Sequence, residues 1–149
     1  MSKSENDFRF KRIMVGMDGS SDSVLAFRYA VSRVKNTDDL LILCTVMSER
    51  HENVFQSLEP SFVYGESDDA VKYLNKYKKF AEKQGVKHVK LVLDEGESAG
   101  EVIIKDVIPH VEPDLLIIGS KSKKGIAKRF GSQAAYMAKY ANIPVMIVR

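Results

Sequence analysis

Short apolar runs alternate with amphipathic helical segments along this chain, and that alternation limits the possible folds more than any other feature. The apolar runs are of strand length and apolar at consecutive positions, as expected for parallel strands buried on both faces. Between them, apolar residues recur at the three- and four-residue spacing of a helix with one buried face. The predicted strands are residues 12–17, 40–46, 86–93, 115–118 and 145–148, and the predicted helices are residues 20–35, 68–84, 98–110 and 132–140.

Strict alternation of strands and helices predicts a parallel sheet, because parallel neighbours need a crossover helix and such crossovers are right-handed. We therefore expect an α/β fold, a single domain over residues 1–149. It should be a doubly wound, five-stranded parallel sheet with helices on both faces, Rossmann-like, in strand order 3-2-1-4-5. Such sheets bind ligands beyond the carboxyl ends of their strands, where the strand order reverses. The residues expected at that edge are Met17, Asp18 and Gly19, Met47, residues 94–96 and the loop that begins at Gly119.

The segment IIGSKSKKGIAKRFGS, residues 117–132, is the clearest candidate for a binding site. Gly119, Gly125 and Gly131 would let the backbone approach a ligand closely, and the first amides of the following helix are unpaired donors with partial positive charge. These are the elements of a phosphate site. From the residues alone, a glycine turn with a solvated basic face is the alternative. The cations of the segment are Lys121, Lys123, Lys124, Lys128 and Arg129.

Composition and charge indicate an ordinary globular chain. Of its 149 residues 44% are hydrophobic, and the net charge of +3 is too mild to indicate a nucleic-acid partner by itself. Cys44 is the single cysteine and lies in an apolar run, so no intramolecular disulfide can form. The polar N-terminus lacks the apolar core of a signal peptide, and no apolar stretch approaches the ~18 residues of a membrane span. We expect a cytoplasmic protein without membrane contact, for which a nucleic-acid partner is unlikely.

Two parts of the chain suggest contacts with partners. Residues 48–65 show no periodicity and contain Pro60, Phe62 and Tyr64, so we expect an irregular flap or interface loop. The predicted fifth strand ends the chain and would leave a sheet edge open. Pairing with a second copy is one way to cover that edge, and a homodimer through the fifth strand is the expected assembly.

No group of residues shows the spacing of a catalytic or metal site. Asp18 can face a ligand or hydrogen-bond the turn into the next helix. Acidic residues 94–101 are typical of a helix N-terminus, and the histidines lack zinc-site spacing. The DGSSDS segment is faintly similar to the phosphate loop of ATP pyrophosphatases, but its glycine pair is absent. Asp18 also lacks the acidic neighbour of a receiver-domain phosphorylation site. We expect no metal ligands and no efficient catalysis.

Four segments in this order resemble the universal stress protein family over nearly the whole chain. They are IMVGMDGS, LLILCTV, DLLIIGSKSKKGIAKRFGS and the closing AYMAKYANIPVMIVR. The resemblance implies the doubly wound sheet, homodimers through the last strand, and, for one subgroup, ATP binding. The function implied is that of a nucleotide-binding regulatory protein of the stress response, with ATP hydrolysis at most slow. The alternative is a dimeric interaction module of the same fold that does not bind ATP.

The ATP-binding subgroup carries Gly-x-x-Gly, nine residues, then Gly followed by Ser or Thr. This chain is similar: Gly119 matches the first glycine, Ser122 stands at the second, and eight residues separate Ser122 from Gly131 and Ser132. By resemblance, Asp18 would lie near the adenosine, Val46 would contact the adenine through its backbone, and the cofactor would be ATP with Mg²⁺ or another divalent cation. The candidate binding residues are Asp18, Val46, Gly119, Lys121, Ser122, Gly131, Ser132 and Gln133.

Overall fold

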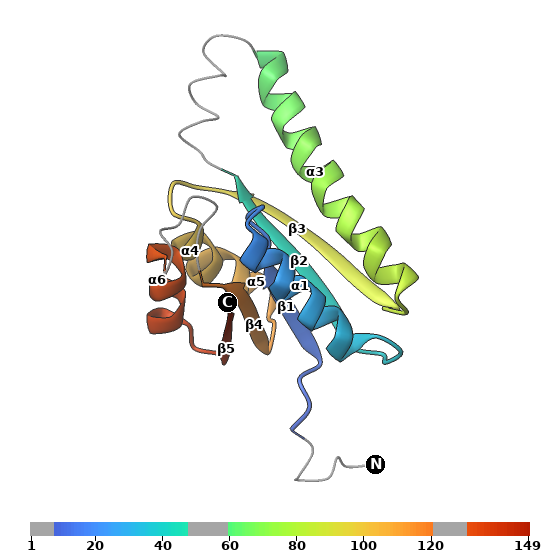
Figure 1. Ribbon diagram of the computed structural model, residues 1–149. Helices are drawn as coiled ribbons and strands as arrows, with labels where there is room; N and C mark the ends of the chain where they lie inside the picture. The colour runs from blue at the N-terminus through green and yellow to red at the C-terminus, as the bar shows by residue number, and fades with distance from the viewer. Residues whose placement is uncertain (1–7, 48–59, 121–130) are drawn as a thin grey trace.

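Five parallel strands form one sheet in the order β3-β2-β1-β4-β5, which confirms the predicted fold class and strand order (Figure 1). The computed structural model describes residues 8–47, 60–120 and 131–149, with the side chains of residues 60–68 left aside. Each pair of neighbours runs parallel, with β1 at the centre between β2 and β4. The strands are β1 (Arg12–Gly16), β2 (Leu40–Met47), β3 (His88–Glu95), β4 (Leu115–Gly119) and β5 (Val145–Val148).

Helices cover both faces of the sheet. Figure 1 shows α1 (Ser21–Val34) and α3 (Pro60–Lys83) on one side and α4 with α6 (Ser132–Tyr140) on the other. The α4 helix (Ala99–Val102) continues through a π turn, η1 (Ile103–Val107), into α5 (Ile108–Val111). Within the described residues, no helix combines the length and the apolar character that crossing a bilayer requires.

Alternate side chains of each strand fill two separate cores, as the period of two along a strand requires. On β1, Ile13 and Val15 pack beneath α1 and α3 together with Phe27. Met14, between them, faces the opposite core with Val102 of α4. Because β1 and the middle of β2 are buried on both faces, their sequences are continuously apolar rather than alternating.

The helix before β3 begins earlier than the sequence pattern predicts. It starts at Pro60 rather than at residue 68, so the expectation of irregular chain over residues 48–65 is wrong for residues 60–65. Proline is favoured in the first turn of a helix, because its fixed φ suits the helix and its missing N–H would have no partner there. Residues 48–59 lie outside the described part of the chain, so the predicted flap stays a prediction for them.

A π turn interrupts the helix predicted over residues 98–110. The N–H of Ile108 donates to Ile103 O, five residues back, immediately before Pro109. Proline lacks an N–H and its ring collides with the carbonyl four residues earlier in a regular α-helix. Widening the helix by one residue at η1 relieves that conflict. Ile103, the first residue of η1, lines the cleft described below.

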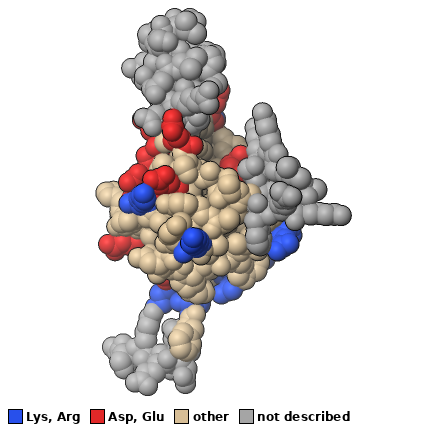
Figure 2. Space-filling model, turned by 90° about the vertical axis from the view of Figure 1, so that its left-hand side faces the viewer, with Lys and Arg blue, Asp and Glu red and all other residues tan. Residues whose placement is uncertain are grey.

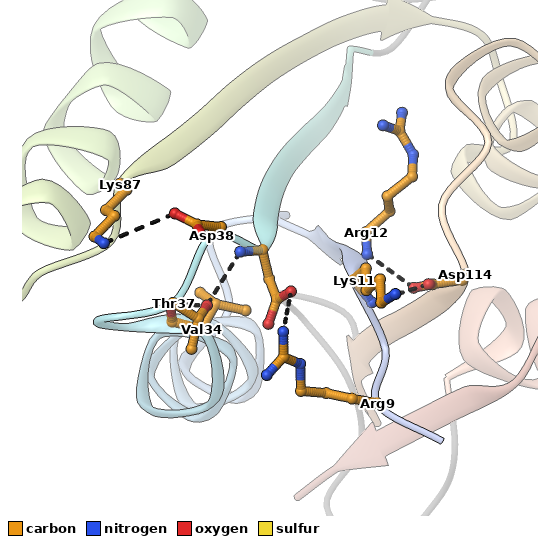
Figure 3. A network of polar contacts seen from close by, with 9 residues as sticks. Arg9, Lys11, Arg12, Val34, Thr37, Asp38, Lys87 and Asp114 are labelled. Atoms are coloured by element: carbon orange, nitrogen blue, oxygen red, sulfur yellow. Dashed lines mark hydrogen bonds and ion pairs between the residues drawn. The ribbon is translucent and has the colours of Figure 1, made fainter. Parts of the chain in front are cut away.

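Polar contacts hold the amino ends of the strands together, as Figure 3 shows. The carboxylate of Asp114 accepts the N–H groups of Lys11 at 2.9 Å and Arg12 at 3.0 Å, and so joins β1 to the start of β4. The Arg9 guanidinium lies 3.3 Å from the buried carboxylate of Asp39, at the start of β2. Lys87 and Asp38 add an exposed pair at 3.7 Å. This network fixes the edge of the sheet that lies opposite the predicted ligand edge.

Candidate functional site

A cleft lies at the carboxyl ends of β1 and β4, where the strand order reverses. It contains four of the eight predicted site residues: Asp18, Val46, Gly119 and Gln133. Its volume is about 80 Å³, small beside the ~300–1,000 Å³ of pockets that enclose a whole ligand. The cleft can therefore enclose only part of a larger ligand. The other lining residues are Gly16, Met17, Cys44, Ala99, Ile103, Ile118, Ala134 and Met137.

The backbone of Val46 faces the space beyond the end of β1. Successive residues of a strand direct their N–H and C=O groups to opposite neighbours. Cys44 O accepts from Met17 N at 2.7 Å on the β1 side, and Met47 O accepts from Gly96 N at 3.0 Å on the β3 side. Val46, two residues after Cys44, therefore directs its N–H and C=O to the same side as Cys44. Because β1 ends at Gly16, these groups point into the space beyond its last residue. An N–H donor and a C=O acceptor are thus presented together at the cleft.

Asp18 follows β1 and has an exposed side chain. One carboxylate oxygen, Oδ1, accepts the N–H of Ser20 at 2.9 Å and shapes the turn into α1. The next residue, Gly19, has φ 82°, which favours glycine, and its N–H donates to the hydroxyl of Tyr73 at 3.1 Å. Asp18 therefore has the turn-forming role that its sequence context allows, and its second oxygen remains at the rim of the cleft.

Gly119 is required by packing. A Cβ built on it would lie 2.7 Å from Asp22 Cβ and 2.8 Å from the backbone of Asp22 and Ser23, so α1 begins directly against the end of β4. Beside this contact, the hydroxyl of Ser120 donates to Asp22 Oδ2 at 2.8 Å, and both side chains are buried. From the sequence, Gly119 was predicted to belong to a ligand loop or to a glycine turn, and the Asp22–Ser120 pair was not predicted. The sequence signal for this contact is an acidic residue in the first turn of α1, Asp22, together with the glycine that ends β4, Gly119.

The first turn of α6 contains backbone donors that have no partner among the described residues. Gly131 is the N-cap, with φ −63° and no side-chain capping bond, and its own N–H donates to Ser120 O at 2.7 Å. The first intrahelical bond that Gly131 accepts comes from Ala135, at 3.0 Å. In this nine-residue helix the N–H groups of Ser132, Gln133 and Ala134 have no partner within the first turn. Such a helix start favours an anion.

The side chain of Gln133 connects two helices. Its Oε1 accepts the N–H of Gly100 at 2.6 Å and the hydroxyl of Ser98 at 3.1 Å, and so ties the start of α4 to the start of α6. Gln133 was predicted as a binding residue. The structure places it on the wall of the cleft with its amide oxygen committed to α4, so its contribution to the site is to hold the two helix starts together.

Two predicted site residues, Lys121 and Ser122, belong to residues 121–130, which lie outside the described part of the chain. Their roles stay predictions. Among the residues that the structure does describe, no three histidine, cysteine or acidic side chains come together as a metal site. The acidic residues after β3 line a hollow of about 350 Å³ beside the cleft, and Figure 2 shows acidic side chains gathered on this face. They are Glu95, Glu97, Glu101 and Asp106.

The fold and the cleft define a Rossmann-like α/β protein with a site at its switch point. The sequence model of the Universal stress protein family matches residues 9–149, and the chain belongs to this family. It is 29% identical over 142 residues to a universal stress protein of Staphylococcus aureus strain USA300, covering 94% of this chain and 84% of that protein.

Solved structures share the fold. The protein MJ0577 superposes with a TM-score of 0.82 at 25% identity, covering 93% of this chain and 95% of that one. A universal stress protein solved in complex with cAMP has a TM-score of 0.67 at 22% identity, with 94% and 97% covered. One from Archaeoglobus fulgidus, solved with dAMP, has a TM-score of 0.61 at 20% identity, with 94% and 98% covered.

Proposed function

We propose that this chain is a cytoplasmic regulatory protein of the stress response that binds ATP at the cleft. The observation that carries the proposal is that one apolar cleft lies between two backbone groups of Val46, which have no partner among the described residues, and the start of α6, whose N-cap Gly131 provides no side-chain bond. The first suits the edge of a purine and the second suits phosphate. A bound nucleotide would contact the first, second and fourth strands at once and so link their loops, which is how occupancy would change the surface offered to partners.

The base would occupy the cleft. Its walls are supplied mainly by aliphatic and methionine side chains, among them Ile103, Ile118 and Met137, which fit the flat faces of a ring. At its rim the N–H and C=O of Val46 can pair with the acceptor and donor of an adenine edge. The second carboxylate oxygen of Asp18, which lines the cleft, would accept a hydrogen bond from a ribose hydroxyl. Complexes of family members with cAMP and dAMP support an adenine ligand of this kind.

The phosphates would lie over the first turn of α6, outside the small cleft. The N–H groups of Ser132 and Gln133 and the hydroxyl of Ser132 are the donors there, with Lys121 and Ser122 expected to add contacts from the loop. Among the described residues that line the cleft, Asp18 is the single carboxylate. A Mg²⁺ ion would therefore be bound mainly by phosphate oxygens and water, which is its usual preference.

Replacing Gly131 by valine tests the proposal. The φ of −63° is open to any residue, so the fold should persist, while a branched side chain at the N-cap would fill the phosphate position. We expect ATP affinity, measured by calorimetry with magnesium, to fall at least tenfold. Ala138→Val, on the exposed side of the same helix, is the matched control and should bind like the parent protein. Equal affinity in folded Gly131→Val would rule out this phosphate position.

The second candidate is an interaction module that does not bind ATP. It is favoured by Ser122 and by the eight-residue spacing, which depart from the ATP-binding loop. Nucleotide released by heating the purified protein and identified by chromatography separates the two candidates. ATP in a one-to-one ratio supports the first, whereas neither released nucleotide nor binding heat supports the second. If Ser122 strains the loop, Ser122→Gly should raise the affinity for ATP.

We also propose that the chain forms a homodimer through β5. On the β4 side, Pro144 O accepts from Leu116 N at 3.0 Å and Val148 O accepts from Ser120 N at 2.9 Å. By alternation, the backbone of Val145 and Ile147 points away from β4. No element of the described chain pairs with this outer side. Two copies related by a twofold axis could pair these edges and continue the sheet.

A further inference from the structure

A groove lies between α1 and α3, on the face of the sheet opposite the cleft. Its volume is about 480 Å³ and its floor is apolar, formed by Val24, Phe27, Tyr77 and Phe80. Phe27 and Tyr77 pack edge-on, with centroids 5.0 Å apart at 72°, and Phe27 and Phe80 lie 5.9 Å apart in a tilted arrangement at 53°. Phe80 is 43% exposed, so part of its ring is open to a partner. Phe80 belongs to neither of the two hydrophobic cores.

Both sides of the groove carry cations. Arg28 stands on the α1 side, and Lys76, Lys79 and Lys83 stand on the α3 side, all four exposed. None of the described residues that line the groove is acidic. No carboxylate of the described residues forms an ion pair with any of these four side chains. The groove therefore combines an apolar floor with unneutralised positive sides.

The spacing of the cations indicates an elongated ligand. Lys76, Lys79 and Lys83 form one stripe along α3 that spans seven residues, about 10 Å at the rise of an α-helix. A fatty acid or another single-headed amphiphile would need cations at one end of the groove only. A ligand with anions repeated along two helical turns and apolar groups between them would satisfy the whole stripe.

We propose that this groove docks an acidic amphipathic helix of a partner protein. The apolar residues of that helix would pack on Val24 and Phe80, and its Glu or Asp side chains would face the lysine stripe of α3 and Arg28 of α1. The groove lies on the opposite face of the sheet from the cleft, shares no lining residue with it and includes no residue of β5, so a docked helix would occupy neither the cleft lining nor the β5 edge. Single-stranded nucleic acid fits less well, because Phe27 is buried and Tyr77 packs edge-on against it, so neither ring presents a stacking face.

A labelled synthetic helix provides the test. The probe is a 15-residue peptide with Leu or Phe at i, i+3, i+4 and i+7 and Glu at the flanking positions, titrated by fluorescence anisotropy at low and high salt. We expect saturable binding that weakens with salt, because the cations are exposed. Amide shifts in NMR spectra should be confined to α1 and the second half of α3. A peptide of the same composition in scrambled order should bind at least tenfold more weakly.

Variants locate the site. Lys76→Glu, Lys79→Glu and Lys83→Glu together should weaken the peptide at least tenfold, as should Phe80→Ala alone. The matched control reverses three charges outside the groove, at Lys78, Lys90 and Lys139, and should bind like the parent protein. Circular dichroism checks folding, and Lys→Gln versions replace any triple variant that does not fold. Absence of peptide binding up to ~1 mM, equal affinity for the scrambled peptide, or unchanged affinity in the groove variants would overturn the proposal. Preferential binding of anionic vesicles or of oligo(dT) would overturn it as well.

Discussion

At the scale of single residues, Gly119 lies where the end of β4 packs against the start of α1, and the contact leaves no room for a side chain. Gly119→Ala should lower the free energy of unfolding by about 1–3 kcal/mol, because its Cβ would meet backbone atoms of Asp22 and Ser23, which cannot rotate away. Gly16→Ala is the control, since its Cβ would come no closer than 3.4 Å, to a side-chain methyl of Ile118. Urea unfolding measures both. Equal stability of the two variants would show that α1 can move away without cost.

Titration of the Cys44 thiol should make the free energy of unfolding depend on pH in the alkaline range. Burial raises the pKa of its thiol from 9.0 to about 12, and the Asp94 carboxylate adds to the rise. Between these values the unfolded chain loses the proton while the folded chain keeps it. The free energy of unfolding should therefore fall as pH rises above about 9, by at most about 1.4 kcal/mol per pH unit from this group.

The control for that prediction is Cys44→Ala, which removes the titrating group and leaves the lysines and tyrosines in place. Urea unfolding from pH 8 to 10 should give a shallower loss of stability in Cys44→Ala than in the parent protein. The thiol should also react with iodoacetamide only after unfolding, because its side chain is 1% exposed. Identical pH slopes in the two proteins would contradict the assignment.

At the scale of helices and strands, Gln133 couples α4 to α6. Gln133→Ala should reduce the free energy of unfolding by about 1–3 kcal/mol, because the N–H of buried Gly100 loses its acceptor. Gln133→Glu keeps an acceptor oxygen near the starts of two helices and should stay close to the parent protein. Gln84→Ala, at an exposed position, is the control in the same urea titrations. Parent-like stability of Gln133→Ala would leave Gln133 without this structural role.

Apolar periodicity predicted the helices and strands well where one face of the element is buried. It failed where a single proline determines where a helix begins or how it is bonded. The strands and α1 are present where the sequence indicated them, and Ser20 caps α1 by accepting the N–H of Ser23 at 3.1 Å. The start of α3 was missed because Pro60 suits a loop and a first helical turn equally. The π turn before Pro109 was missed because apolar spacing does not report which carbonyl each N–H reaches.

The candidate site was predictable in outline because parallel strands place their carboxyl ends together. Asp18, Val46 and Gly119 follow from that rule with the family resemblance, and the structure brings them to one cleft. The contribution of Gln133 could not be predicted, because its partner Gly100 is 33 residues away in the sequence and the contact depends on how α4 and α6 pack. Long-range pairs of this kind are a property of the tertiary structure.

At the scale of the whole molecule, the proposed homodimer makes a prediction that separates assembly from folding. Ile147→Pro removes an N–H that points away from β4, so the ladder between β4 and β5 keeps its hydrogen bonds while edge pairing with a second copy loses one of its own. We expect this variant to be folded by circular dichroism and monomeric in sedimentation at concentrations where the parent protein is dimeric. Met146→Pro, which would remove an inward-pointing N–H, should instead disrupt the sheet. A folded Ile147→Pro dimer would mean that the subunits associate through another surface, and a parent protein that is monomeric at all concentrations would exclude the dimer altogether.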